Sequence, residues 1–347
     1  MRNTSIVVSL LFVATVFSGC TGGPANDWAY KMTGLRSVGS LDGEGIRVAI
    51  VDTGIEADHP SLDHVNVIWR DEVNGRPEPY DDVGHGTHVA GILAGESGSL
   101  GARIQGYNLK GAAPKVDIIA VKAIRAEDGR GEKVDVANGI TFAIQNKADV
   151  ICLSLGADPN ALDLLLDDMD DAVGSAVNQG ILVVASAGNL RENEEQSDVK
   201  VPASIELVVA VGAVDQGKKV TSFSSHGSEE SNQGRFGTGI GGRPDPSKKP
   251  EVVAPGDRIK GAWMDDGYAI ASGTSQAAPF VCGALALLLQ KCVNLRAQNS
   301  ASMVRTVKAE LMESAEKLAG QRTPHDNAAG YGLLRADKLL EAFGPNC

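Results

Sequence analysis

Apolar residues recur in five short, nearly uninterrupted runs from residue 46 onward, and many of them are β-branched. The runs cover residues 46–52, 117–124, 149–155, 180–185 and 207–214. A strand with one face in solvent alternates apolar and polar residues, whereas a strand covered on both faces does not. The pattern therefore predicts a mainly parallel sheet between two layers of helices.

Stretches with helical spacing separate these runs. They cover residues 85–94, 134–146, 162–179, 275–291 and 300–318. Strands that alternate with helices indicate an α/β fold, here a three-layer αβα sandwich. The apolar residues 277–289 are too few to cross the roughly 30 Å hydrocarbon layer of a membrane, so we interpret them as a central core helix. The glycine- and proline-rich residues 224–250 are interpreted as a surface loop within one domain.

The N-terminus has the pattern of an export signal. Residues 6–17 form an apolar run that follows a basic residue and precedes two small residues and Cys20. Residues 17–20 are similar to a lipobox, whose cysteine is lipidated and becomes the new N-terminus, although a phenylalanine stands where leucine is usual. We predict a lipoprotein-type signal peptide at 1–19 and a short linker at 20–27, with simple secretion or an uncleaved buried helix as alternatives.

The charge balance narrows the function classes. The 347 residues include 32 basic and 44 acidic side chains, which gives a formal charge of −12. Nucleic-acid binding depends on clustered Lys and Arg, so this balance argues against a nucleic-acid partner. A nucleotide-binding α/β domain is also disfavoured, because no glycine-rich phosphate loop with its lysine follows a predicted strand.

Four cysteines follow Cys20, and they allow three complete disulfide pairings. Cys282 and Cys292 lie in one helical run about 15 Å apart, which is too far for a disulfide. Cys152 lies inside a predicted strand, where we interpret it as a small buried hydrophobic residue. In an oxidising compartment we favour a bridge from Cys292 to Cys347 that ties down the C-terminus.

Three residues at the ends of predicted elements carry candidate chemistry. Asp52 ends the first strand, His85 begins a helix, and Ser275 follows a Gly-Thr turn and begins another helix. A serine hydroxyl is a poor nucleophile near neutral pH, so acyl transfer requires a histidine that accepts its proton and a buried carboxylate that orients the histidine. Each residue alone has an ordinary structural explanation, such as a helix cap. Together they predict acyl-transfer chemistry.

The order Asp, His, Ser and the residues around each of them resemble the subtilisin-like serine proteases. The matching segments are 48–54, 84–91 and 273–279. The resemblance extends from residue 28 to about 342, so we assign 28–347 to one peptidase domain. It implies that Asp52 orients His85, that His85 is the general base and acid, and that Ser275 is the nucleophile.

The segment 186–189 follows a predicted strand and is similar to the oxyanion segment of that family. The resemblance implies that the side-chain amide of Asn189 and the backbone N–H of Ser275 stabilise the oxyanion. His88 lies one turn after His85, but no suitably placed third ligand for a shared metal is apparent. We interpret His88 as a packed or hydrogen-bonded residue and assign no metal site.

Two segments match the edges along which the family binds substrate as an added strand. They are Gly129, Arg130 and Gly131 on one side, and Ser154, Leu155 and Gly156 on the other. Glycine in the first segment lets two main chains approach closely, and the second segment also forms one wall of the pocket for the side chain before the cleaved bond. A loop glycine and a simple strand end are the respective alternatives.

The sequence departs from the family pattern at two places. Many secreted relatives carry an inhibitory propeptide of several dozen residues, whereas here Trp28 already matches the start of the catalytic domain. Ser61 stands where relatives often have an aspartate that binds structural calcium, and the matching loop is unrecognisable between Glu96 and Lys110. Loss of a carboxylate weakens an all-oxygen site. We expect no cofactor for catalysis and leave structural calcium open.

The resulting prediction is an exported, monomeric serine endopeptidase that acts on polypeptides through an acyl-enzyme and is tethered to a membrane by lipid on Cys20. The alternative from another class is a catalytically silent lipoprotein that binds peptides on the same scaffold. The presence of Asp52, His85, Ser275 and Asn189 argues against that alternative. The side-chain preference of the substrate pocket is not evident from the sequence.

Overall fold

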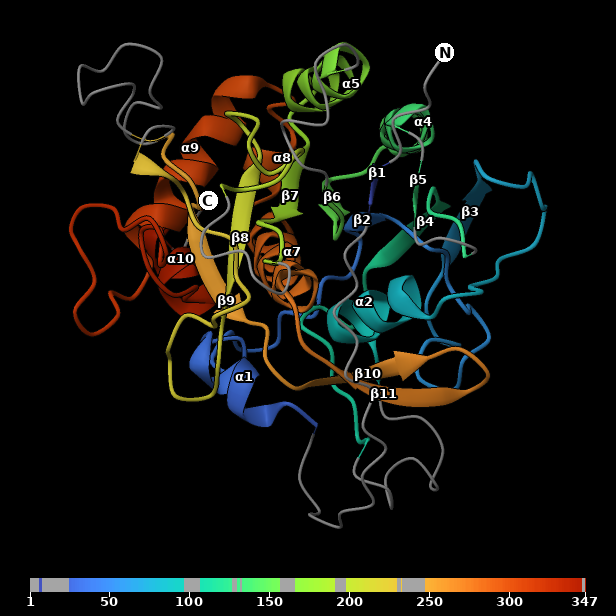
Figure 1. Ribbon diagram of the computed structural model, residues 1–347, viewed down its shortest axis with the longest axis horizontal. Helices are drawn as coiled ribbons and strands as arrows, with labels where there is room; N and C mark the ends of the chain where they lie inside the picture. Colours follow the sequence, from blue (N-terminus) through green and yellow to red (C-terminus); the bar gives the residue numbers. More distant parts are fainter. Residues whose placement is uncertain are drawn as a thin grey trace.

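The computed structural model describes residues 6–7, 25–96, 107–126, 130–131, 133–156, 166–190, 198–229, 232, 247–344 and 347. Its centre is a seven-stranded sheet in the order β3-β4-β2-β6-β7-β8-β9 (Figure 1). Every neighbouring pair in this sheet is parallel. The predicted α/β class with a mainly parallel sheet is therefore confirmed.

Five of the seven strands are those that the apolar runs predicted. They are β2 (Arg47–Asp52), β4 (Asp117–Lys122), β6 (Val150–Leu153), β7 (Leu182–Ser186) and β8 (Val209–Val214). Apart from the first residues of β2 and β4, all their residues are buried. Continuous burial explains the lack of alternation in the sequence, since helices cover both faces of the sheet.

The two outermost strands were not predicted. The edge strand β3 (Val67–Asp71) is mostly half-exposed and mixes apolar with charged residues, so it lacks the continuous apolar run. The opposite edge strand, β9 (Val252–Pro255), has only four residues and ends in a proline. A proline has no N–H for the ladder and is tolerated at a sheet edge. Both strands therefore lack the signature on which the prediction relied.

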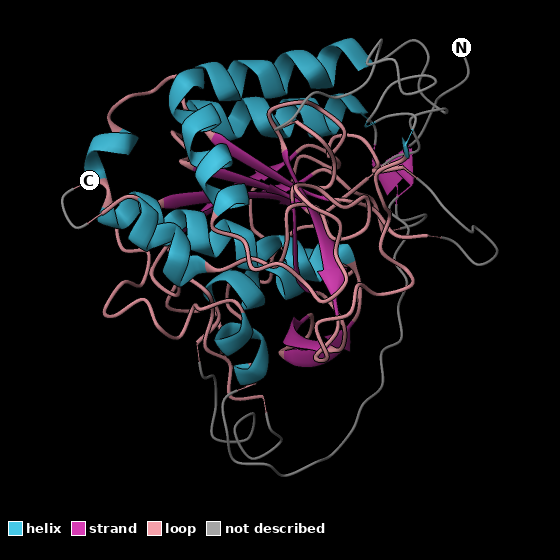
Figure 2. Ribbon diagram, turned by 90° about the vertical axis from the view of Figure 1, so that its left-hand side faces the viewer, coloured by secondary structure: helices cyan, strands magenta, loops and turns pink. Residues whose placement is uncertain are grey.

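Helices cover both faces of the sheet, which completes the three layers (Figure 2). On one face α4 (Lys133–Gln145) and α5 (Leu166–Asn178) pack against each other. On the other face α2 (His85–Ala94) packs against α7 (Thr274–Lys291), which contacts five of the strands. Sixteen of the 18 residues of α7 are buried, as expected for the predicted core helix.

Two further pairs of strands lie outside the main sheet. The hairpin of β10 (Ile259–Trp263) and β11 (Gly267–Ala271) packs on α2 and leads directly into α7. The short strand β1 (Ile6–Val7) pairs antiparallel with β5 (Arg130–Gly131). The hairpin thus packs on α2, whose first residue is the candidate histidine, and immediately precedes α7, whose second residue is the candidate serine.

Of the remaining described helices, one lies near the start of the domain and three follow α7 in the chain. They are α1 (Asp27–Met32), α8 (Val293–Arg296), α9 (Ala301–Glu313) and α10 (Ala336–Ala342). The predicted helix 300–318 was too long, because α9 ends at Glu313. The backbone of Glu316 instead exchanges two hydrogen bonds of 2.8 Å with Leu333, and this pairing requires an extended chain.

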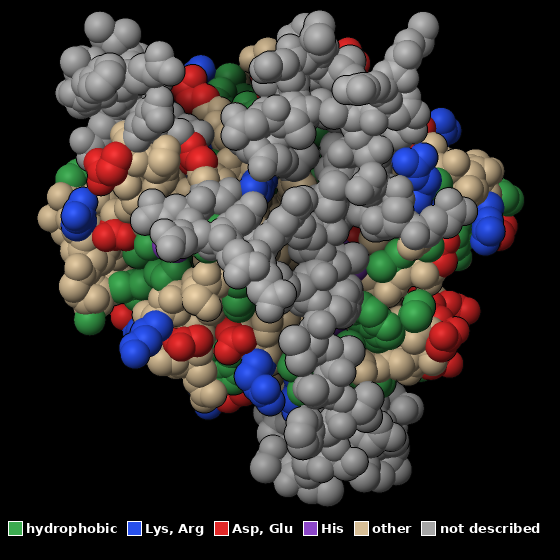
Figure 3. All heavy atoms as spheres, in the orientation of Figure 1, with side chains coloured by type: hydrophobic (Ala, Val, Ile, Leu, Met, Phe, Trp, Pro, Cys, Tyr) green, Lys and Arg blue, Asp and Glu red, His purple; other side chains and the backbone are tan. Residues whose placement is uncertain are grey.

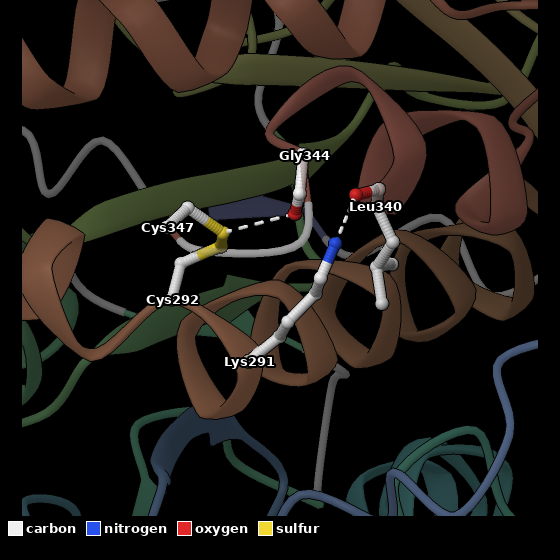
Figure 4. The surroundings of a disulfide bond; sticks show 5 residues. All are labelled: Lys291, Cys292, Leu340, Gly344 and Cys347. Atoms are coloured by element: carbon white, nitrogen blue, oxygen red, sulfur yellow. Dashed lines mark hydrogen bonds between the residues drawn. A yellow bond between two sulfur atoms is a disulfide. The ribbon is translucent and has the colours of Figure 1, made fainter.

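A disulfide joins Cys292 to Cys347, as the sequence favoured, and attaches the C-terminus to the end of α7 (Figure 4). The Cα atoms of the pair are 4.6 Å apart, within the usual range for a disulfide. Cys152 and Cys282 are buried free thiols. In the part of the chain that the structure describes, no helix combines the length and the apolar character needed to cross a membrane.

Candidate active site

The site lies where three neighbouring strands end. Asp52 is the last residue of β2, Ser154 directly follows β6, and Asn189 follows β7 by three residues. These strands are adjacent and parallel in the order β2-β6-β7. Adjacent strands lie about 4.8 Å apart, so their carboxyl ends bring the three residues to one edge of the sheet.

Asp52 and His85 form a buried hydrogen-bonded pair. The Nδ1 atom of His85 lies 2.6 Å from Oδ1 of Asp52, and both side chains are about 2% exposed. The backbone N–H of Thr53 also donates to Asp52 Oδ1, at 2.7 Å. Among the described residues, Nε2 of His85 and Oδ2 of Asp52 have no hydrogen-bond partner. The carboxylate thus orients the imidazole while Nε2 remains available for a proton.

The carboxylate also determines the charge state of the histidine. Burial by itself lowers the pKa of His85, but the negative charge of Asp52 and the hydrogen bond to it prevail, so the pKa of His85 is raised above its ordinary value. By contrast, burial lowers the pKa of His88 to about 3. Only His85 of these two can change protonation state near neutral pH.

Asp81 fixes the start of α2, and with it His85. Its carboxylate accepts hydrogen bonds of 2.8 to 3.0 Å from the backbone of Val83, Gly84 and Thr87 and from the Thr87 hydroxyl. It also accepts the hydroxyl of Thr53 at 2.9 Å. These bonds satisfy N–H groups that have no partner within a helix. Asp81 was not among the predicted site residues, although an acidic residue just before a helix is a known capping signal.

The main chain before His85 also has no room for side chains. Gly84 has a φ angle of 90°, and a Cβ atom on it would lie 2.5 Å from the ring of Trp263. Trp263 belongs to the β10–β11 hairpin, whose contact with α2 therefore depends on glycine at this position.

Ser275 is the second residue of α7 and is held by two reciprocal hydrogen bonds with Ser154. Its Oγ donates to the carbonyl of Ser154, and the Ser154 hydroxyl donates to the carbonyl of Ser275, both at 3.1 Å. The second bond has a clear cause. Pro279 lies four residues further along the helix and has no N–H to donate to the Ser275 carbonyl, so Ser154 provides the missing donor. The Ser275 side chain is not bonded to His85 in this structure.

Asn189 is oriented by Thr274, the residue before the serine. Its Oδ1 accepts the backbone N–H of Thr274 at 3.0 Å and the Thr274 hydroxyl at 3.1 Å. Because the amide oxygen is held on this side, the NH₂ group of Asn189 faces the other way. The arrangement thus provides an oriented hydrogen-bond donor beside the start of α7.

Comparison of the sequence with known proteins identifies its family. Residues 43–332 match the model of the subtilase family. The chain belongs to the subtilase family. It is similar to subtilisin DY of Bacillus licheniformis, with 37% identity over 76% of this chain and 82% of that protein. It is also 34% identical to a thermophilic serine proteinase of Bacillus sp. (strain AK1), over 89% of this chain and 65% of that protein.

A third relative is the major intracellular serine protease of Bacillus subtilis (strain 168), which is 32% identical over 72% of this chain and 69% of that protein. Together these matches identify the chain as a serine-type endopeptidase of the subtilisin type. The chain spans slightly less than two thirds of the thermophilic proteinase and more of the other two relatives.

The predicted substrate edges of this subtilase are described in part. Arg130 and Gly131 form β5, whereas Gly129 lies outside the described residues, as does the predicted lipidation site Cys20. On the opposite edge the side chains of Ser154 and Leu155 are buried, and only Gly156 is partly exposed. Ser154 therefore contacts Ser275 rather than solvent.

Ser61, which stands where relatives often have a calcium-binding aspartate, belongs to an uncharged hydrogen-bond network in this subtilase. The hydroxyl of Ser61 shares a 2.9 Å hydrogen bond with the hydroxyl of Tyr268, and its backbone N–H donates to His59 at 3.0 Å. The described residues contain no group of three or more His, Cys, Asp or Glu side chains that could hold a metal. The loop residues 97–106 are outside that set.

Proposed function

We propose that this subtilase is an exported endopeptidase that cleaves peptide bonds through an acyl-enzyme on Ser275. The observation that carries the proposal is the buried 2.6 Å contact between Asp52 and His85, which leaves Nε2 of His85 without a partner among the described residues. A histidine held by a carboxylate at Nδ1, with Nε2 left without a partner, has the arrangement that a general base requires.

In this mechanism the Ser275 hydroxyl turns from the Ser154 carbonyl towards Nε2 of His85. Such a rearrangement is common, because catalytic hydrogen bonds often tighten only when substrate is bound. The hydroxyl attacks the substrate carbonyl while His85 accepts its proton, and Asp52 stabilises the resulting imidazolium. The NH₂ group of Asn189 and the backbone N–H of Ser275 then donate to the oxyanion.

Breakdown of the tetrahedral intermediate completes acylation. His85 gives its proton to the leaving amine, and the first product departs. A water molecule next attacks the acyl-enzyme while His85 again accepts a proton, and transfer of that proton to Ser275 restores the serine. No step requires a metal or an organic cofactor.

The pairing of β1 with β5 supports substrate binding as an added strand. Ile6 lies opposite Gly131 and Val7 lies opposite Arg130, in antiparallel register. This edge can therefore form main-chain hydrogen bonds with an extended segment, which is how a polypeptide substrate would bind. On the face drawn in Figure 3, the described Lys and Arg side chains lie scattered among Asp and Glu, which supports a polypeptide rather than a nucleic acid as partner.

Labelling with a fluorophosphonate tests the nucleophile. We expect covalent labelling and casein hydrolysis by the wild-type protein, and loss of both, by about 10⁶-fold in kcat, in Ser275→Ala. Ser272→Ala is a matched control, because this neighbouring serine bonds Asp257 and Arg258 and should be dispensable for labelling. Full labelling of Ser275→Ala would exclude Ser275 as the nucleophile. A folded wild-type protein without labelling or hydrolysis would instead indicate the catalytically silent peptide-binding scaffold.

Lipid on Cys20 is the proposed anchor, which rests on the similarity of residues 17–20 to a lipobox. The Cys292–Cys347 disulfide supports an oxidising compartment outside the cytoplasm. Cys20→Ser should release the protein from membranes or block its processing, and fractionation with measurement of apparent mass distinguishes these results. A variant found in membranes at the wild-type mass would contradict the lipid anchor.

A further inference from the structure

Lys200 lies between two glycines on either side of the candidate substrate pocket. A Cβ atom built on Gly188 would be 2.3 Å from Cγ of Lys200, and one built on Gly156 would be 2.9 Å from its Cβ. Such distances are too short for real atoms, so the lysine stem lies directly against the main chain of both glycines. The stem of Lys200 therefore lies against both the segment after β6 and the segment after β7.

These two glycines flank the position of the substrate side chain before the cleaved bond, the P1 side chain. Gly188 directly precedes Asn189, the proposed oxyanion donor. Gly156 is two residues after Ser154, whose carbonyl holds the Ser275 hydroxyl. The P1 Cα is bonded to the carbonyl carbon that Ser275 attacks, so the P1 side chain begins close to Ser275. Residues 154–156 are the predicted wall of its pocket on one side, and Asn189 holds the oxyanion on the other, so this side chain begins between the two segments. The Lys200 stem is therefore part of the boundary of the P1 pocket.

The backbone holds Lys200 in this place. Its N–H donates to the carbonyl of Ala187 at 2.8 Å, and its own carbonyl accepts the N–H of Ser204 at 3.0 Å. The side chain is half-buried. A lysine with a buried stem keeps its ammonium in a polar region. The ammonium of Lys200 is three bonds from the Cγ that lies against Gly188, so it lies close to the boundary of the pocket.

We propose that Lys200 makes this subtilase prefer an acidic side chain, Asp or Glu, at P1. The proposal rests on the proposed endopeptidase function. An opposite charge in a partly desolvated pocket is attracted, and a like charge is repelled, so the lysine favours an acidic P1 group and disfavours a basic one. Because specificity is a difference between substrates, it does not require Lys200 to lack partners within the protein.

Asp198 is the described acidic residue nearest to Lys200 in the sequence. Asp198 lies two residues earlier, and its carboxylate accepts the N–H of Val199 at 2.8 Å and the hydroxyl of Ser228 at 3.3 Å. These bonds hold the Asp198 carboxylate on the side of Ser228.

The test uses three peptide p-nitroanilides that differ only in P1, which is Glu, Gln or Lys. Glu and Gln have nearly the same shape, so the ratio of their kcat/KM values isolates charge. We expect this ratio to fall about tenfold from wild type to Lys200→Met, the effect of one partly screened charge pair, and to be retained in Lys200→Arg. The ratio in wild type should also fall with added salt.

The controls separate the specificity from the basic activity. Lys338→Met removes an exposed lysine of α10 and should leave the ratio unchanged. Cleavage of the Gln peptide by Lys200→Met shows that this variant is folded and active. A Glu-to-Gln ratio that is the same in wild type and Lys200→Met overturns the role of Lys200 but not the protease function. Absence of cleavage of all three peptides by wild-type protein that hydrolyses casein overturns the role of Lys200 alone, whereas absence of casein hydrolysis and of labelling overturns both.

Discussion

Two groups of buried charged residues differ in how their charges are matched. At the candidate active site, Asp52 and His85 bond to each other and leave one oxygen and one nitrogen without described partners. Beside β9, Glu251 lies between Lys249 and Lys308, with its Oε1 atom 2.9 Å and 2.6 Å from their ammonium groups. All five side chains are buried, so burial alone does not distinguish the two groups.

The second group is connected to the backbone at each member. Glu251 Oε2 accepts the N–H of Ala210 at 2.7 Å, and Lys249 donates to the carbonyl of Val208 at 2.6 Å. Lys308 donates to the carbonyl of Glu206. These bonds join β8, β9 and α9, and each of the three charged side chains has both an ion contact and a bond to the backbone.

The proposed catalytic group of charges differs from the structural one in what completes it. A buried charge is stable only when it is paired and hydrogen-bonded, which the lysine–glutamate group achieves within the fold. The aspartate–histidine pair is left incomplete at the edge of the sheet, where a hydroxyl or a substrate can complete it. Substitutions in the first group should therefore change activity, and those in the second should change stability.

Among substitutions in these two groups, the largest effect should follow Asp52→Asn. We expect kcat to fall by about 10⁴, the size known for this change in other serine proteases, with little loss of stability. In wild type kcat/KM should rise with pH as His85 loses its proton, with an apparent pKa above 6.5, because Asp52 raises the pKa of His85.

Removal of the Asp52 charge leaves burial as the dominant influence on the His85 pKa, so this rise should shift to lower pH in the variant. His88 cannot account for the rise, because its pKa is about 3. Rate profiles from pH 4 to 9 test both statements. An identical midpoint in wild type and variant would show that another group controls the profile.

Glu251→Gln should lower stability rather than activity. It leaves two ammonium groups buried without their carboxylate, and breaking a buried pair in this way costs about 3 to 5 kcal/mol of unfolding free energy. Urea unfolding measures the loss, while kcat of the folded enzyme should remain near wild type. Lys31→Ala is the control, since its exposed pair with Asp27 contributes about 0.5 kcal/mol or less. Loss of activity without loss of stability would contradict the structural role.

The smallest of the three effects should follow Asn189→Ala. The amide acts on charge that develops in the transition state, so kcat should fall by about 10² to 10³ while KM changes little; this magnitude is the one known for a subtilisin. Steady-state kinetics measures both constants. A raised KM with unchanged kcat would assign Asn189 to substrate binding and would remove it from the catalytic group.

The sequence was sufficient to predict the inner strands of the sheet and to identify the candidate active-site residues. The strands β2, β4, β6, β7 and β8 are covered on both faces, and continuous apolar runs report such burial directly. The edge strands β3 and β9 carry no such signal, because one is half-exposed and the other is very short. Asp52, His85 and Ser275 were predicted because the residues around each resemble a family pattern.

What only the tertiary structure decided is how these residues are held. The carboxylate of Asp81 fixes the start of α2, Ser154 replaces the donor that Pro279 lacks, and Thr274 orients the amide of Asn189. Each contact except the first joins residues more than 80 positions apart in the chain. The place of Lys200 between two glycines is decided in the same way. Local patterns record which face of an element is buried, whereas the partner of a polar side chain depends on how distant elements pack.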